Sequence, residues 1–465
     1  MTTPEPDGTN GTAVPEHPGS AEPPGTDPAR LRWSDVGLVA AVAVLVRMVV
    51  VVGLARDPQG LHDPYLYRAF ARGLADGAGY VGLLGNPTTY YPPGYPVFLG
   101  GVQWIADAVG QSDRLPLFAG VVQALLGGVA AGATAVAAAR LWDGRPEPSS
   151  SPSPARRRRL VLVAGLIVAL WPNLVLYSAV LLSESLFVAL FAVFVAAVLS
   201  LGDLGRPRPG VVVLAAASFG AATLVRPQVL ISLPFLALAW WLARVGWRRV
   251  LVGSGVLAVG AAAFVVPWTI RNAVVMDQFV PISTNGGDNL CIGFHDGADG
   301  RFSAPAACAT DGSYVDGPEV EVERDAQNRD RAVEWATSHL TELPLLSVRK
   351  VWHTFASDRD ALFAVESYGS DAFVPSGLRR FVAGLGDAVY YAILVAAAVG
   401  VAVSVPAARR RQAAPLLLLG LTAAGVLVPA LFFGDPRFKV ALVPCLAVLA
   451  AAGVDAVTTR FGGSS

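Results

Sequence analysis

Long apolar runs separated by short charged segments are the feature that most constrains how this chain can fold. Each run is close to the roughly 17 to 25 residues that cross a hydrocarbon core about 30 Å thick. Lipid offers the backbone no hydrogen-bond partner, so such runs must form helices. The sequence therefore predicts an all-α polytopic membrane protein with about ten transmembrane helices. The runs are 36–55, 115–139, 160–178, 182–201, 210–226, 228–243, 250–270, 380–404, 414–433 and 438–457.

The composition supports this fold class. Of the 465 residues, 54% are hydrophobic and only 15% are charged, whereas a soluble domain carries roughly 25% charged residues. The formal net charge is zero, so the total charge gives no support for a nucleic-acid partner. We expect the lipid bilayer to be the main surroundings of the chain.

The basic residues indicate how the chain crosses the membrane. Positively charged loops stay on the cytoplasmic side, and five basic clusters share one side of the membrane if the loops alternate. This predicts a cytoplasmic membrane protein with both termini in the cytoplasm. The segment 277–371 carries 17 acidic and 7 basic residues and is expected outside. The basic clusters are 29–33, 156–159, 206–208, 244–249 and 409–411.

Four regions follow from this topology. The first 30 residues, rich in Pro, Gly, Glu and Thr, are expected to form a disordered cytoplasmic tail. An N-terminal membrane module follows and contains a first outer loop. A second outer loop is predicted to form a small extracytoplasmic cap, and the remaining residues to form the C-terminal transmembrane helices. The regions are 1–30, 31–270 with the first outer loop at 56–114, 271–379 and 380–465.

Two segments of the outer loops need their own interpretation. The stretch 93–110 is apolar but short and contains prolines, and counting it as a span would reverse the charge rule for every later loop. We therefore expect it to be an interfacial helix. In the cap, 319–357 has helical spacing, whereas 283–318 is rich in Gly, Asp and Ala and is predicted to be loop.

Ionisable residues gather at the outer ends of the predicted spans. Such groups are costly at membrane depth, by about 2.5 to 3.5 kcal/mol near a helix centre, and usually face a cavity or a partner. They are either interfacial anchors and helix caps or parts of one site. A carboxylate beside several basic side chains suits a substrate with an anionic phosphate and a reacting hydroxyl. The residues are Asp63, Glu184, Arg226, Arg271, Asp435, Arg437 and Lys439.

Further side chains of interest lie near these charges. Tyrosines of the first outer loop form either an aromatic belt or a wall of a sugar site, because each offers an apolar face and a hydroxyl. Arg47, inside the first span, either faces the bundle or extends outward. The candidates for contacting sugar or acceptor are His62, Tyr67, Tyr90, Tyr91, Tyr95 and Glu184.

Three cysteines are present. Cys291 and Cys308 both lie in the predicted cap, outside the cytoplasm, where they form either a disulfide or two free thiols. No second pair stands at the spacing of a metal site. We therefore assign no metal ligands from the sequence.

Several motifs together resemble the membrane-embedded glycosyltransferases of the GT-C superfamily, in particular the family 39 group that includes protein O-mannosyltransferases and the aminoarabinose transferase of lipid A. The motifs are "HDPYLYRAFARGLADGAGY", "PTTYYPPGYPVFLG", "LLSESLFVALF" and "LVRPQVL", with a looser match in "GDPRFKVALVPCLAVLAA". The resemblance implies sugar transfer from a polyprenyl phosphate at the outer face, with inversion. It also implies that Asp63 is the base.

The chain departs from that group at two points. Tyr91 stands where the aminoarabinose transferases place a Lys before the paired prolines, and Asp63 has no adjacent second acid. The phosphate partner must then come from elsewhere, and we expect it among Arg226, Arg271, Arg437 and Lys439. The requirement for a divalent metal is left open.

The sequence thus favours a hexosyl- or pentosyltransferase acting on a polyprenyl-phosphate sugar and a glycan, lipid or protein acceptor. The alternative from another class is a transporter or lipid flippase, which predicts charges near span centres and two pseudo-symmetric halves. A third is a non-catalytic envelope scaffold, for which convergent charges are not required. The sequence identifies neither the sugar nor the acceptor.

Overall fold

The computed structural model describes residues 31–141, 153–303, 305, 308 and 317–462, and within these ranges it contains helices and no extended strand. The predicted cytoplasmic tail, residues 1–30, lies outside the described residues. Contacts within the chain place the described residues in one unit that begins at Leu31. The all-α prediction is confirmed.

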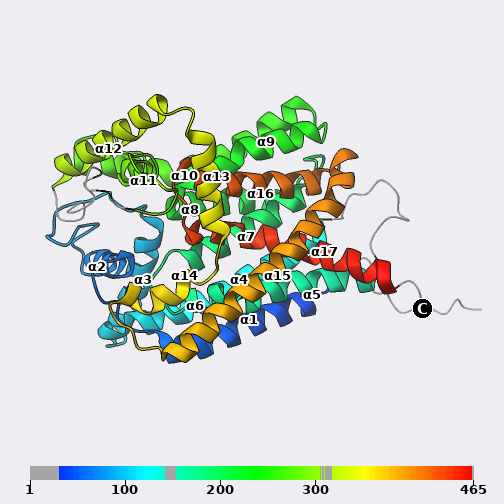
Figure 1. The fold of residues 1–465 in the computed structure, drawn as a ribbon, viewed down its shortest axis with the longest axis horizontal. Coiled ribbons are helices and arrows are strands. Elements are labelled where there is room, and N and C mark those ends of the chain that lie inside the picture. The colour runs from blue at the N-terminus through cyan, green and yellow to red at the C-terminus, as the bar shows by residue number, and fades with distance from the viewer. Residues whose placement is uncertain (1–30, 142–152, 304, 306–307, 309–316, 463–465) are drawn as a thin grey trace, which may run out of the picture. The chain divides into compact units, whose positions relative to one another are not determined.

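Each of the ten predicted apolar runs is helical (Figure 1). Seven segments are long and apolar enough to cross a membrane, and two shorter apolar helical segments lie at 209–225 and 227–242. The prediction of a polytopic membrane protein is therefore confirmed. The helices are α1 (Trp33–Leu54), α4 (Leu115–Arg140), α5 (Pro154–Leu170), α6 (Pro172–Tyr177), α7 (Glu184–Leu201), α8 (Pro209–Val225), α9 (Ser232–Leu242), α10 (Trp247–Met276), α15 (Ser376–Arg409), α16 (Ala413–Leu431) and α17 (Val443–Gly462).

Small residues allow these helices to pack closely. In the contact between α15 and α17, a Cβ added to Gly400 would lie 1.8 Å from the carbonyl oxygen of Leu449, and one added to Gly453 would lie 2.1 Å from that of Ala396. Close backbone approach of this kind is typical of membrane helix pairs, where apolar burial alone gives little driving force. The C-terminal helices are thereby fixed against each other.

Arg47 of α1 faces the bundle, which settles the two alternatives for this residue. It is buried, and its guanidinium donates to the carbonyl oxygens of Val168 at 2.9 Å and Ala169 at 2.8 Å. These carbonyls belong to the last turn of α5, which ends just before Pro172. Proline has no N–H to offer, so Arg47 provides the donors that the end of this helix lacks.

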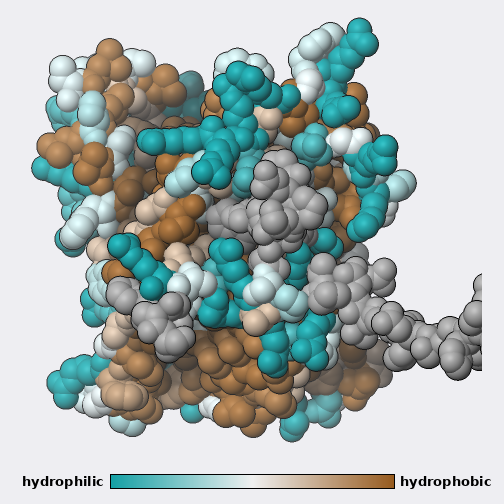
Figure 2. Space-filling model, turned by 90° about the vertical axis from the view of Figure 1, so that its right-hand side faces the viewer, coloured by the Kyte–Doolittle hydropathy of each residue, from teal (hydrophilic) through white to brown (hydrophobic). Residues whose placement is uncertain are grey.

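Charged residues at the other end of the bundle pair with arginines of α5. Arg156 and Arg159 both bind Asp455 of α17, and Arg158 binds Asp35 of α1. Figure 2 looks at this end of the molecule and shows hydrophilic side chains across it, with hydrophobic side chains on the flank. The pattern is that of a membrane protein viewed along its spans.

The predicted first outer loop, residues 56–114, contains two helices, α2 (Asp63–Ala75) and α3 (Gly94–Ala108), which pack against each other. The α3 helix has 15 residues and buries one side, including Tyr95 and Leu99, while Trp104 is exposed. A helix therefore forms where the sequence predicted an interfacial one. Its location at the membrane surface stays a prediction.

The segment predicted to form the cap, residues 271–379, holds α11 (Gly286–Gly293), α12 (Pro318–Ser338), α13 (Leu343–Phe355) and α14 (Asp360–Val365). The prediction of loop throughout 283–318 is wrong at α11. Its Gly-rich sequence is a poor helix former, but it packs tightly on α12, where a Cβ at Gly287 would lie 1.9 Å from the carbonyl oxygen of Asp325. Tertiary packing thus overrides local propensity here.

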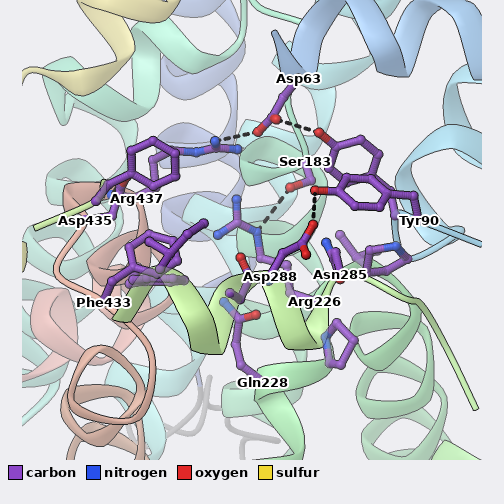
Figure 3. A pocket seen from close by; sticks show the side chains of 18 of the residues that line it. Asp63, Tyr90, Ser183, Arg226, Gln228, Asn285, Asp288, Phe433, Asp435 and Arg437 are labelled. Atoms are coloured by element: carbon purple, nitrogen blue, oxygen red, sulfur yellow. Dashed lines mark hydrogen bonds and ion pairs between the residues drawn. The ribbon is translucent and has the colours of Figure 1, made fainter. Parts of the chain in front are cut away.

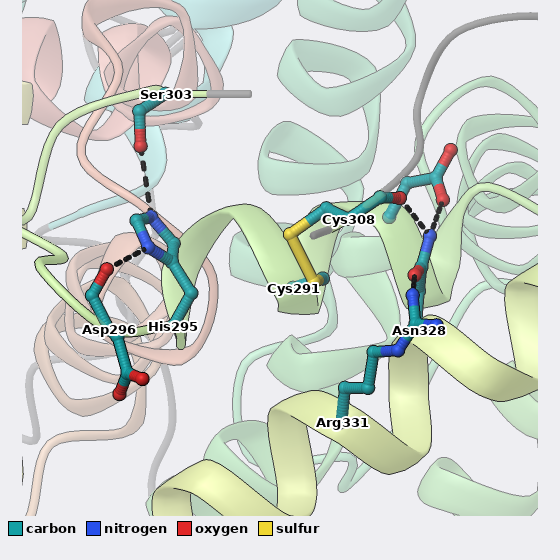
Figure 4. Close-up of a disulfide and its surroundings, with 8 residues drawn as sticks. Cys291, His295, Asp296, Ser303, Cys308, Asn328 and Arg331 are labelled. Carbon is teal, nitrogen blue, oxygen red and sulfur yellow. Dashed lines mark hydrogen bonds between the residues drawn. A yellow bond between two sulfur atoms is a disulfide. The ribbon is translucent and has the colours of Figure 1, made fainter. Parts of the chain in front are cut away.

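Two connections fix the cap. A disulfide joins Cys291 of α11 to Cys308, with a Cα–Cα distance of 5.7 Å (Figure 4). The buried carboxylate of Glu321 on α12 accepts hydrogen bonds from Thr88 Oγ1 at 2.6 Å, from both the backbone N–H and Oγ1 of Thr89 at 2.9 Å, and from Thr284 Oγ1 at 2.5 Å. Glu321 therefore ties α12 to the first outer loop.

Candidate active site

Asp63 is the first residue of α2, and its carboxylate points to other side chains rather than to the amides of its own helix. Tyr91 donates its hydroxyl to Asp63 Oδ1 at 2.8 Å, and Arg437 donates from Nη1 to Asp63 Oδ2 at 2.6 Å (Figure 3). Burial raises the pKa of this carboxyl, but the Arg437 charge and the two hydrogen bonds outweigh it and hold the pKa below its ordinary value. Asp63 is therefore ionised at neutral pH.

Arg437 reaches Asp63 because of a local turn in the "GDPRF" segment. The side chain of Asp435 accepts from the backbone N–H of Arg437 at 2.7 Å, which caps the 3-10 helix η6 (Pro436–Leu442). From this position Arg437 also donates from Nε to Glu184 Oε1 at 2.6 Å. One guanidinium thus bridges two carboxylates.

Glu184 begins α7 and is fully buried. The same oxygen, Oε1, accepts from Arg226 Nη2 at 2.5 Å, and Arg226 Nε donates to Ser183 Oγ at 3.1 Å. Arg226 leaves the helical conformation at the end of α8, before Pro227, as expected for a residue that precedes proline. The two arginines are therefore held side by side by one carboxylate.

Asp63, Ser183, Arg226 and Arg437 form one wall of an open cavity of ≈ 270 Å³ between the membrane helices and the predicted cap. Polar side chains in and next to α11 form another wall. One of them, Asp288, accepts a hydrogen bond at Oδ2 from the Tyr90 hydroxyl at 2.9 Å (Figure 3). Burial raises the pKa of Asp288. The residues that surround the cavity include Asp63, Tyr67, Tyr90, Tyr91, Ser183, Arg226, Gln228, Asn285, Asp288, Asn289, Phe302, Phe433, Asp435 and Arg437.

Seven of the residues predicted from the sequence line this cavity: Asp63, Tyr67, Tyr90, Tyr91, Arg226, Asp435 and Arg437. Three others lie just outside it. The His62 ring packs against Tyr368, the Tyr95 hydroxyl donates to Gln123 Oε1 at 2.8 Å, and Glu184 lies behind the two arginines. Glu184, a candidate for contacting sugar or acceptor, binds both arginines through Oε1.

Arg271, predicted to bind the phosphate, is not among the residues that line this cavity. This residue lies in the last turns of α10, donates to the carbonyl oxygens of Tyr80 and Thr88 at 3.0 Å each, and packs over the Trp268 ring. All of these contacts fix the shape of the first outer loop. Its charge is therefore used for structure and does not face the cavity.

Lys439, also predicted to support phosphate binding, is not among the residues that line the cavity either. It is 1% exposed, pairs with Asp358 Oδ1 at 3.1 Å and donates to the carbonyl oxygen of Ser357 at 2.7 Å. The reason is the 3-10 geometry of η6. With three residues per turn, residues two apart point in directions about 120° apart, so Arg437 and Lys439 cannot serve one site.

Sequence reasoning missed the polar residues that the cap supplies. Asn285, Asp288 and Asn289 lie in a segment predicted to be loop, where Asn and Asp are ordinary residues with no special meaning. Ser183 and Gln228 were also missed, although each is a neighbour of a charged candidate in "LLSES" or "VRPQ". Their position in the sequence, close to a charge at the end of an apolar run, was the signal that could have identified Ser183 and Gln228.

The part of the chain that the structure describes holds no group of three His, Cys, Asp or Glu side chains placed to share a metal ion. Both oxygens of Asp63 already accept hydrogen bonds, Oδ1 from the Tyr91 hydroxyl and Oδ2 from the Arg437 guanidinium, whose positive charge repels cations. The residues around Asp63 therefore do not suit a metal site, and no step below uses a metal.

The chain is a helical membrane bundle with two helices in the segment after α1 and a charged cavity, an arrangement similar to the GT-C fold. No family model and no curated protein matches the sequence. Among solved structures it is similar to the oligosaccharyltransferase of Archaeoglobus fulgidus in the apo form, at 15% identity and a TM-score of 0.53, over 92% of this chain and 50% of that one.

Two further solved structures are similar to this chain. The Archaeoglobus fulgidus oligosaccharyltransferase AglB in complex with an inhibitory peptide and a dolichol-phosphate matches with a TM-score of 0.52 at 15% identity, covering 92% and 50% of the two chains. ArnT from Cupriavidus metallidurans, bound to undecaprenyl phosphate, matches with a TM-score of 0.41 at 17% identity, covering 93% and 80%. The present chain spans about half the length of the oligosaccharyltransferase.

Proposed function

We propose that this protein is a glycosyltransferase that moves a sugar from a polyprenyl-phosphate donor to the hydroxyl of a glycan, lipid or protein at the outer face of the cytoplasmic membrane. The observation that carries the proposal is that one carboxylate, Asp63, and two guanidinium groups, Arg226 and Arg437, line the same cavity between the membrane helices and the cap. The fold supports it, since AglB with the same fold has been seen with a dolichol-phosphate.

The two arginines are the proposed binding site for the donor phosphate. A guanidinium offers a planar fork that matches phosphate oxygens, and Glu184 keeps both forks at the cavity. An apolar cleft between α7, α9 and α16 adjoins the cavity, shares Gln228 with it and contains Phe187, Leu421 and Val428. This apolar side of the cavity is where the lipid tail would leave the phosphate, so the phosphate would be held where the bilayer ends.

Asp63 is the proposed base. It takes the proton of the acceptor hydroxyl as that oxygen bonds to the anomeric carbon, and the bond from this carbon to the phosphate oxygen breaks. The polyprenyl phosphate leaves with the electron pair and the configuration is inverted. Arg437 currently holds Asp63 ionised. A phosphate that draws on Arg437 would weaken this hold and make the carboxylate a stronger base, while the arginines stabilise the departing charge.

The cap is the proposed acceptor side of the site. The amide and carboxylate groups of Asn285, Asp288 and Asn289 can hydrogen-bond to the hydroxyls of a sugar or the amides of a peptide. The Tyr90 ring offers an apolar face. The transporter alternative gains no support from the described charges. Arg47, which lies within α1, is satisfied by backbone carbonyls rather than by a path through the membrane.

The proposal is tested by incubating membranes that contain the protein with a panel of polyprenyl-phosphate sugars, each radiolabelled in the sugar. We expect one label to move from the lipid to an acceptor fraction, and membranes with Asp63→Asn to lose this transfer. Movement of intact labelled lipid across the bilayer, without cleavage of the sugar, would instead establish the flippase alternative.

A further inference from the structure

A second cavity lies far from the candidate active site, at the opposite end of α7. It is an apolar groove of ≈ 270 Å³ between the end of α7, α8 and the first turns of α10. Glu184 begins α7 and Leu201, which lines the groove, ends it. With 18 residues and a rise of 1.5 Å per residue, the two ends lie about 26 Å apart. The groove is therefore on the other side of the membrane region.

The walls of the groove are aliphatic, and its mouth is basic. The lining includes Leu204, Val212 of α8 and Val252 and Val256 of α10, together with Arg248 and Arg249. Both arginines are exposed. Over the described residues neither forms an ion pair or donates a side-chain hydrogen bond, and Arg248 lies over the Trp247 ring, 5.4 Å from its centre. Two positive charges without an acidic partner thus stand at the entrance to an apolar slot.

The backbone holds this groove in an unusual conformation. Leu204, in the connection between α7 and α8, has a φ of 58°, in the left-handed region that bulky residues rarely adopt. Its side chain reaches α10, where a Cβ at Gly253 would lie 2.7 Å from Leu204 Cδ1. Gly253 therefore makes room for a leucine held at a conformational cost, and strain of this kind concentrates at ligand sites.

We propose that this groove binds an anionic diacyl phospholipid, with its phosphate on Arg248 and Arg249 and one acyl chain between α8 and α10. The basic clusters predict that this end faces the cytoplasm, where the leaflet carries anionic lipids that attract juxtamembrane arginines. A soluble phosphate has nothing to place in the aliphatic slot, and a neutral lipid has no net charge for the two arginines. The proposal does not depend on sugar transfer.

Binding is measured on the full-length protein in detergent, by native mass spectrometry and by the melting temperature during titration with phosphatidylglycerol, phosphatidylcholine or inorganic phosphate. We expect one phosphatidylglycerol to stay bound and to raise the melting temperature, with no comparable effect of the other two. The double variant Arg248→Gln, Arg249→Gln should weaken phosphatidylglycerol binding on the order of tenfold or more.

A second variant tests the groove without changing charge. Val252→Trp fills the slot, whereas Val259→Trp adds the same bulk on α10 at a position that does not line the groove; the two valines are 65% and 69% exposed. The charge control is Arg409→Gln, Arg410→Gln, another exposed pair. We expect only the two groove variants to lose the lipid.

Three results would overturn the proposal. Equal binding of phosphatidylcholine would show an ordinary annular lipid. Equal losses in the Arg248/Arg249 and Arg409/Arg410 variants would show nonspecific attraction by charge. Retention of phosphatidylglycerol by well-folded Val252→Trp protein would show that no acyl chain occupies the groove.

Discussion

Asp63 and Arg437 lie 374 residues apart in the sequence and meet at 2.6 Å in the wall of the candidate active site. The first residue of α2 is thereby joined to the turn that precedes α17. Because Arg437 also binds Glu184, and Glu184 binds Arg226, four charged groups from four segments form one connected, balanced set. The site exists only when the whole membrane domain has folded.

The first prediction concerns the role of Asp63. Asp63→Asn keeps the shape and a hydrogen bond to Tyr91, but an amide cannot accept the acceptor proton. We expect sugar transfer to fall by about 100-fold or more, while the protein still binds the donor. The measurement is transfer of labelled sugar together with binding of the labelled lipid. Asp113→Asn, at an exposed position of the same loop, is the control; near-normal transfer by Asp63→Asn would end the assignment of the base.

The second prediction separates two arginines that the sequence could not distinguish. Arg226 lines the cavity, whereas Arg271 binds the carbonyls of Tyr80 and Thr88. We expect Arg226→Gln to weaken donor binding and to slow transfer. Arg271→Gln should lower the melting temperature, since it leaves two carbonyls without their donor, but the folded fraction should bind donor normally. Equal donor affinities of the two variants would contradict the assignment of the phosphate site.

Most of the fold could be predicted from the sequence because lipid restricts which backbone structures can form. A run such as 115–139 has to be a helix in a membrane, and it became α4 with little change of its ends. The same rule has no force outside the bilayer. There α11 forms from "GGDNLCIG" only because α12 supplies close contacts, and contacts of that kind are not visible in local sequence.

The sequence predicted several charged residues of the candidate site but not how their side chains are arranged around the cavity. Asp63, Arg226 and Arg437 were found because a charge at the end of an apolar run is costly and needs a reason. The same argument selected Lys439, which turns toward Asp358 instead. Whether a residue of η6 faces the cavity depends on the phase of one 3-10 turn, which is fixed by the cap on Asp435 and by packing.

The third prediction concerns the disulfide between Cys291 and Cys308. Asn328 links the two ends of this region, since its side-chain amide donates both to Asp288 Oδ1 at 2.6 Å and to the carbonyl oxygen of Cys308 (Figure 4). The disulfide closes a segment with a sequence separation of 17. In the chain-entropy model this closure adds about 3 kcal/mol to the free energy of unfolding. Its loss should also loosen Asp288 at the cavity.

We therefore expect Cys291→Ser to lower the melting temperature and to raise the KM for the acceptor, with a smaller effect on the KM for the donor. Dithiothreitol should reproduce both effects in the wild-type protein. Cys445→Ser, which changes the free cysteine buried in α17, is the control for the loss of a thiol. Unchanged acceptor kinetics in stable Cys291→Ser protein would show that the disulfide only stabilises the cap.

The last prediction concerns Lys350 of α13, a buried amine with no hydrogen-bond partner among the described residues. Its Nζ lies 3.2 Å from the centre of the Phe294 ring. Burial lowers the pKa of Lys350 from its ordinary 10.5 to about 7. Between these two values the unfolded chain binds a proton that the folded protein does not, so stability must rise as the pH increases through this window. From pH 7 to pH 9 the gain from this residue is about 2 kcal/mol.

Lys350→Met removes the titrating group and keeps much of the apolar stem. We expect the melting temperature of the variant to exceed that of the wild type most strongly at pH 7 and below, with the difference shrinking by pH 9. Arg349→Met, at the exposed neighbouring position of α13, should show a constant difference from the wild type over the same range. A difference between Lys350→Met and wild type that does not change with pH would mean that Lys350 stays charged in the folded protein, with the ring of Phe294 as its partner.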